Sequence, residues 1–145
     1  YFANKLWNIA RFILANIDSI DFEKSHQDLS AKTDADKDII EKLGTAVLET
    51  SKNLERYNIH EATQALYSFA WHEFADTYIE ASKPQLANPE LAENTKEILG
   101  VALATMTKLL HPFMPFITEK IWSFLPGRPE NLLMVEPWPS QDRHT

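Results

Sequence analysis

Cysteine is absent from this sequence, and only three of its 145 residues are glycines: Gly44, Gly100 and Gly127. Without cysteine the chain forms neither disulfides nor thiolate metal sites, a composition typical of a reducing compartment, so we expect it in the cytoplasm. So few glycines leave no glycine-rich loop to hold a nucleotide phosphate, and no serine nucleophile elbow is present. These absences argue against a catalytic site within the chain.

Long apolar runs and basic clusters are also missing. No stretch approaches the ~18 apolar residues of a membrane span, and the start shows no basic segment followed by an apolar one, so we expect neither a membrane partner nor export. The 14 basic and 21 acidic residues give a net charge of −7. This charge counts against general attraction to a polyanion, although a local face of Lys, Arg and Asn can still contact RNA.

The apolar content of 44% and the aromatic content of 11% suffice for one hydrophobic core. The sequence begins at Tyr1 inside an apolar-periodic pattern, with no helix start signal. We therefore expect a single, monomeric domain over residues 1–145, excised from a longer protein.

Apolar residues recur at three- and four-residue spacing throughout, which predicts helices joined by short loops. We predict helices over residues 3–17, 33–56, 58–83, 88–110 and 115–125, a flexible loop over 22–32, and an extended segment over 130–145. Thr33 with Asp36 resembles a capping box, Asn88 and Pro89 suit a helix start, and Pro84 is expected to prevent further helix. The short connections make neighbours antiparallel, so the predicted fold is all-α, an antiparallel helix bundle of about five helices.

Three carboxylates of the third predicted helix, Glu73, Asp76 and Glu80, share one face if the helix is regular. Such spacing could serve an acid pair in a hydrolase, but it is more typical of a solvated polar face. His72 lacks a second histidine one turn later, so we expect no metal site. His111 stands in a Leu-His-Pro context that favours a bond to a helix-terminal carbonyl.

The first helix carries the most informative polar pattern. Rotation by about 100° per residue brings Asn4, Asn8 and Arg11 into one outward arc opposite the apolar stripe, with Lys5 and Phe12 on its edge. Unpaired RNA bases stack on aromatic or guanidinium planes, while Asn and Arg bind their edges. The alternative is that Phe12 packs against another helix and the polar residues are ordinary surface.

Three segments resemble a known family: NKLWNIARF at 4–12, AWHEFADTYIE at 70–80 and LHPFMPFITEKIW at 110–122, with MVEPWP at 134–139 as a closing segment. Their order and spacing are similar to the anticodon-binding domain of class I aminoacyl-tRNA synthetases, most of all the valyl enzymes. Isoleucyl and leucyl enzymes share this domain and remain alternatives. A helical protein-interaction module, favoured by the acidic charge, is the alternative from a different class.

The resemblance implies a domain that binds the anticodon stem-loop of tRNA, valine-specific tRNA first of all. Catalysis and ATP would belong to the longer protein's catalytic domain, its partner in cis, which ligates valine to tRNA. We therefore expect no catalytic residue, metal or cofactor in this chain. The resemblance implies that Arg11 and Asn8 bind base edges or phosphates, Phe12 stacks, and Lys5 and Asn4 support them.

Aromatic and proline residues elsewhere are predicted to determine the fold, because their spacing places them on inner helix faces or at helix starts. They are Trp71, Phe74, Tyr78, Pro112, Pro115, Phe116 and Trp122.

Overall fold

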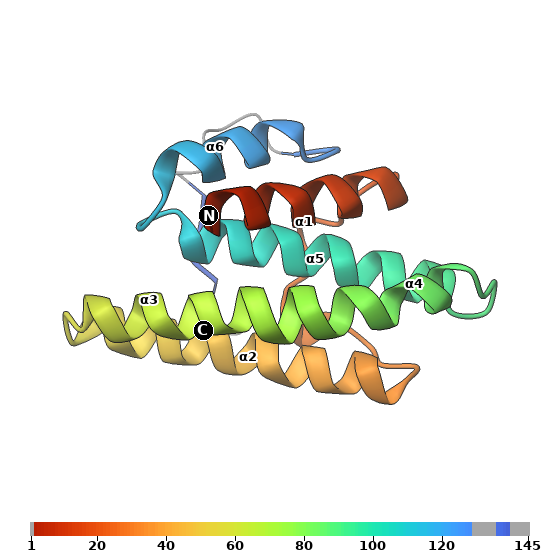
Figure 1. Cartoon of the computed structure of the whole chain (residues 1–145), viewed down its shortest axis with the longest axis horizontal. Coiled ribbons are helices and arrows are strands. Elements are labelled where there is room, and N and C mark those ends of the chain that lie inside the picture. The colour runs from red at the N-terminus through yellow and green to blue at the C-terminus, as the bar shows by residue number, and fades with distance from the viewer. Residues whose placement is uncertain (1, 129–135, 140–145) are drawn as a thin grey trace.

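The computed structural model describes residues 2–128 and 136–139, which form helices lying side by side (Figure 1). In chain order the elements are α1 (Phe2–Asn16), the 3-10 turn η1 (His26–Asp28), α2 (Asp34–Glu55), α3 (Ile59–Ser68), the π-helix η2 (Phe69–Ile79), α4 (Glu80–Leu86), α5 (Ala92–Leu110) and α6 (Pro115–Phe124). The elements α3, η2 and α4 follow one another without a break and make one long rod. Over the described residues there are thus five rods and no strand, which confirms the predicted all-α bundle.

Helix α5 forms the centre of the bundle. Thirteen of its residues between Thr95 and Leu110 are buried, as expected for a helix that is apolar nearly all round. Consecutive rods run antiparallel, as predicted, whereas α1 and α6 run in the same direction (Figure 1). Helix α1 packs on α5 between α6 on one side and η2 on the other, which leaves one ridge of α1 facing outward.

The core follows the apolar stripes predicted from the sequence. Helix α1 buries Leu6, Ile9 and Ile13 against the other helices. Trp122, Tyr78 and Phe74 are the largest fully buried side chains, as predicted. Burying a large apolar side chain contributes about 1.5–3 kcal/mol, so these positions dominate the stability of the bundle.

A buried carboxylate links α2 to α4 and η2. The Thr33 hydroxyl accepts from the Asp36 amide (3.0 Å), as the predicted capping box requires. The Asp36 carboxylate, however, accepts from the Lys32 amide (3.0 Å) and not from the Thr33 amide, so only half of the predicted box forms. Asp36 also accepts from the Tyr78 hydroxyl (2.8 Å) and the Gln85 amide (2.9 Å). Burial raises the pKa of Asp36, but the hydrogen bonds from Gln85, Lys32, Tyr78 and Thr33 outweigh it and hold the pKa below 3.8.

The prediction that Pro84 prevents further helix is wrong, because α4 continues through it to Leu86. Proline removes one amide donor and normally breaks a helix interior. Here it occupies the last turn, only two residues before the end, so few helical hydrogen bonds depend on its position. The Pro84 side chain is exposed.

Two further segments differ from the prediction: the start of α5 and the predicted loop over residues 22–32. Helix α5 begins at Ala92 rather than at Asn88, because the Asn88 side chain accepts from the Glu90 amide (2.9 Å) and closes a separate turn. The segment 22–32 contains the 3-10 turn η1, whose Ser25 and Asp28 form a capping box of their own. Local side-chain to backbone bonds of this kind compete with helix, and periodicity does not detect them.

The prediction of an extended segment over 130–145 lies outside the described residues except for 136–139. There the Trp138 indole donates to the Ser51 hydroxyl of α2 (2.9 Å). None of the helices in the described ranges combines the length and apolar character needed to cross a membrane.

The corner between α5 and α6 corrects two further expectations. Phe116 was expected on an inner face, yet it is 91% exposed, because Ile121 and Trp122 set the inward phase of α6. The Nδ1 of His111 contacts the hydroxyl of Thr118 (2.8 Å) instead of a carbonyl. Since that hydroxyl donates its proton to the Met114 carbonyl (2.9 Å), Nδ1 is the donor and joins the two helices.

Candidate nucleic-acid interface

Helix α1 differs in charge from the rest of the molecule. Lys5 and Arg11 are its only charged residues, and all 21 acidic residues of the chain lie outside it. An acidic protein with a net charge of −7 therefore presents one helix that carries positive charge alone. Local positive charge of this kind is what a phosphate backbone requires.

The outward ridge of α1 consists of Asn4, Asn8, Arg11 and Ala15, all exposed as the 100° rotation predicted. The side chains of Asn4, Asn8 and Arg11 make no hydrogen bond or ion pair within residues 2–128 and 136–139. The Asn16 amide donates to the Phe12 carbonyl (2.7 Å) and satisfies one of the free carbonyls at the end of this helix. Two amides and a guanidinium are thus held on a regular helix and are free to bind a ligand.

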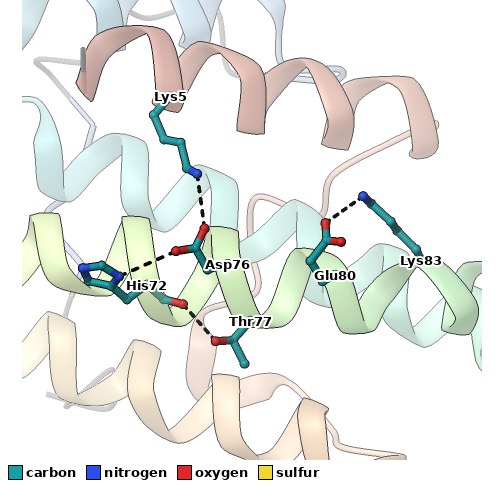
Figure 2. Close-up of polar contacts among 6 residues, drawn as sticks. All are labelled: Lys5, His72, Asp76, Thr77, Glu80 and Lys83. Atoms are coloured by element: carbon teal, nitrogen blue, oxygen red, sulfur yellow. Dashed lines mark hydrogen bonds and ion pairs between the residues drawn. The ribbon is translucent and has the colours of Figure 1, made fainter.

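Lys5 and Phe12, the other two predicted site residues, turn toward η2 and α4. The Lys5 ammonium donates to the Asp76 carboxylate (3.2 Å; Figure 2). It also lies 4.9 Å from the centre of the Trp71 ring. Phe12 is half-buried and packs against the core, with the Lys83 ammonium 5.9 Å from its ring centre. Phe12 was expected at the solvent-facing edge of the arc, and it is instead half-buried there, because part of its ring packs against the core.

A groove of about 560 Å³ separates the ridge from η2 and α4. Its charged residues are already paired: Lys5 with Asp76 at 3.2 Å, and Lys83 with Glu80 at 2.7 Å (Figure 2). Exposed pairs like these contribute about 0–1 kcal/mol each to stability. Their electrostatic consequence is that this groove, which we call the η2 groove, carries no net charge.

A second groove of about 610 Å³ lies on the other side of the ridge, toward α6, and we call it the α6 groove. Trp7, Phe12 and Phe124 contribute its aromatic walls, and among the described residues its lining contains Arg11 but no carboxylate. The rings of Trp7 and Phe124 meet edge to face at 5.7 Å, and the Lys120 ammonium lies 5.5 Å from the Trp7 ring centre. Both grooves fall in the ~300–1,000 Å³ range of ligand sites.

Trp7, Lys120 and Phe124 lie at this groove but were not among the residues predicted to bind RNA. A signal was available on α6, where Phe116, Lys120 and Phe124 follow at four-residue spacing and all prove exposed. Such spacing places two aromatic rings and a cation on one outward face. What the spacing could not reveal is that this face stands beside α1.

The prediction that Glu73, Asp76 and Glu80 share one face is wrong for Glu73, whereas Asp76 and Glu80 both line the η2 groove. Glu73 bonds Lys42 of α2 (2.7 Å), whereas Asp76 bonds Lys5 of α1. The π-helix has i→i+5 bonds, as the Thr77 hydroxyl bond to the His72 carbonyl also illustrates, so residues three apart no longer stack.

The three carboxylates are nevertheless solvated and paired with cations, as the polar-face interpretation predicted. The hydrogen bond that Lys42 donates to the Glu73 carboxylate raises the pKa of Lys42 above 10.5. A hydrolase acid pair of Glu73 and Asp76 is excluded, since the two side chains point to different helices.

Comparison with known proteins identifies the family of the chain. A family model described as "Anticodon-binding domain of tRNA ligase" matches residues 36–145. A valine–tRNA ligase of Bacillus thuringiensis is 42% identical over 142 residues, 96% of this chain and 16% of its own length. That of Syntrophotalea carbinolica is 45% identical over 130 residues, 87% of this chain and 14% of its own.

A solved structure shares the fold. It is a LeuRS of Agrobacterium radiobacter in a ternary complex with tRNA and LeuAMS. The two structures match with a TM-score of 0.67 and 19% sequence identity, and the match covers 96% of this chain and 16% of the LeuRS chain. The chain spans about 16% of the length of the relatives it matches. Since the family model covers most of the chain, and since the helices and their order fit, the chain belongs to the family of anticodon-binding domains of tRNA ligases.

Proposed function

We propose that the chain binds the anticodon stem-loop of valine tRNA through the outward face of α1. The observation that carries the proposal is the ridge of Asn4, Asn8 and Arg11, unengaged and exposed on a helix without acidic residues. Asparagine and arginine side chains bind base edges and phosphates, which are the two chemical groups that an unpaired RNA loop presents.

The roles of the five residues follow from their positions. Arg11 and Asn8 contact base edges or phosphates, and Asn4 extends the same ridge by one turn. Lys5, which is paired with Asp76, stands beside the ridge and supports Arg11 and Asn8. The half-buried Phe12 lines both grooves, so one edge of its ring can contact a base.

The longer protein would be a valine–tRNA ligase, as the names of the relatives support. In that protein a separate catalytic domain would use ATP to attach valine to tRNA, while this domain, itself without cofactor, would hold the distant anticodon. A cytoplasmic location is part of the same proposal.

The test is a titration of the chain with valine tRNA and with an anticodon-altered version at low and moderate salt. We expect the altered anticodon to bind more weakly, and Arg11→Ala to reduce affinity for valine tRNA by about 5- to 100-fold, equivalent to about 1–3 kcal/mol. Affinity should fall with salt, because each phosphate contact releases counterions. Leucine and isoleucine tRNAs serve as competitors that test the valine specificity.

Lys37→Ala is the matched control, since it removes one exposed positive charge from α2, away from the ridge. It should change affinity less than twofold by the same titration. If neither the anticodon nor Arg11 affects binding, the proposal is wrong. If Lys37→Ala weakens binding as much as Arg11→Ala does, the binding reflects only general attraction between positive charge and RNA.

A further inference from the structure

The two grooves beside the ridge of α1 differ in charge, and this difference favours one of them for RNA. In the η2 groove the ammonium groups of Lys5 and Lys83 are each held by a carboxylate. A phosphate entering there would have to displace Asp76 or Glu80 and then lie beside the freed carboxylate. Repulsion between like charges at such short range opposes that exchange.

The α6 groove offers the opposite conditions. Within residues 2–128 and 136–139, Arg11 is the charged residue of its lining and no carboxylate lines it. Its lining includes the small, exposed side chain of Ala15, which leaves room for a flat ring, and the half-exposed Phe124 forms a wall. Charge and shape therefore both complement an unpaired nucleotide with its phosphate.

Phe124 is held in place from its inner side. Its ring meets Trp7 edge to face at 5.7 Å, and Lys120 covers Trp7 with its ammonium 5.5 Å from the ring centre. The side chain is still 56% exposed, so a large part of it has no protein contact. An aromatic ring that is fixed by its neighbours and exposed to solvent can stack a base at little conformational cost.

We propose that the α6 groove is a stacking subsite for one unpaired base of the RNA loop, with Phe124 as its stacking ring. Arg11 contacts the phosphate or the second face of the base, and Asn8 bonds the base edge, since both side chains line the same groove. The subsite rests on the proposed function, because it assigns a groove to the RNA that the ridge binds. Stacking of this kind tolerates any base, because every base has a π-face.

The test measures binding of the chain to an anticodon-arm hairpin of valine tRNA and to versions with one loop base removed in turn. Phe124→Leu should weaken binding of the intact hairpin by about 5- to 100-fold, the effect of losing one base–aromatic stack. Phe124→Tyr, which retains the ring, should bind within about twofold of the parent chain. With one of the abasic hairpins, the loss caused by Phe124→Leu should disappear, because the base that the ring stacks is gone.

Phe116→Leu is the matched control, because it removes an even more exposed phenylalanine from the same helix, outside the groove. It should leave binding unchanged. If Arg11→Ala weakens binding but Phe124→Leu does not, the subsite is wrong while the proposed function stands. If neither variant has an effect, both are wrong, and the face would then suit a protein partner better than RNA.

Photocrosslinking tests the subsite without any substitution. Hairpins carrying 5-iodouracil at single loop positions are irradiated with the parent chain, and the linked peptide is identified by mass spectrometry. A crosslink at Phe124 supports the proposal. A crosslink only at Trp71, which lies beside Lys5 on the η2 side of the ridge, overturns it.

Discussion

Replacing the buried carboxylate of Asp36 tests how the bundle holds α2 against η2 and α4. Asp36 is 1% exposed and no cation contacts it among the described residues, so its charge is stabilised by neutral donors alone. In Asp36→Asn the new amide group faces the backbone amide of Lys32, 3.0 Å away in the parent chain. Two donors then oppose each other, and the bonds from Tyr78 and Gln85 lose their charge assistance.

The magnitude follows from these contacts. A buried donor left without an acceptor costs about 1–3 kcal/mol, and a hydrogen bond to a neutral acceptor is about 0.5–1.5 kcal/mol weaker than one to a charged acceptor. Removing the charge also relieves its desolvation, but the lowered pKa of Asp36 shows that the hydrogen bonds outweigh that penalty. We therefore expect a loss of about 2–4 kcal/mol in the free energy of unfolding.

Urea denaturation followed by circular dichroism measures this loss. Asp38→Asn is the matched control, because Asp38 is exposed on the same helix and pairs only with Lys42 (3.0 Å); it should change stability by less than about 0.5 kcal/mol. A double-mutant cycle with Tyr78→Phe should show coupling, since one hydrogen bond of 2.8 Å joins the two side chains. A loss below about 1 kcal/mol for Asp36→Asn would refute the reasoning, because a single neutral bond contributes that much.

The same variant has a defined pH dependence. The pKa of Asp36 is lower in the folded state than its ordinary 3.8, so the folded protein favours the ionised form. Its contribution to stability is therefore complete above pH 3.8 and is lost as the pH falls through the folded-state pKa. The stability difference between the parent chain and Asp36→Asn should be constant near neutral pH and narrow below about pH 4. A difference that widens on acidification would contradict the assigned role.

Three other substitutions test the remaining parts of the structure. Asp76→Asn should release Lys5, strengthen RNA binding and steepen the dependence of log affinity on log salt by about one unit; an unchanged slope would show that Lys5 does not reach a phosphate. Thr50→Val should stabilise the chain by about 1 kcal/mol in urea, because the buried Thr50 hydroxyl has no partner in the described part of the chain. Phe74→Ala should cost about 3–5 kcal/mol in the same assay, since Phe74 is fully buried, and a cost below 2 would mean that the core repacks around the cavity.

The amino-acid sequence by itself determined the helices and their inward faces. Apolar spacing is a property of each helix alone, so it correctly placed Leu6, Phe74 and Trp122 in the core. For the same reason it placed Asn4 and Arg11 on an exposed ridge, because the opposite side of a packed helix faces outward. The Thr33 cap of α2 is likewise local and needed no tertiary information.

Tertiary structure decided what each outward residue meets. Lys5 is neutralised by Asp76 and Phe12 packs on the core because η2 lies beside α1, a proximity that no spacing within either helix reveals. The π-helix also changed the angular positions of Glu73 and Asp76, which a regular helical rotation cannot represent.

The two grooves depend on tertiary structure most of all. Trp7 and Phe124 stand 117 positions apart in the sequence, yet they meet because α1 and α6 both pack on α5. A single helix can expose an arginine and two amides, as α1 does. Only two helices packed side by side can form a groove with aromatic walls and no carboxylate beside them, because its opposite sides must come from different parts of the chain.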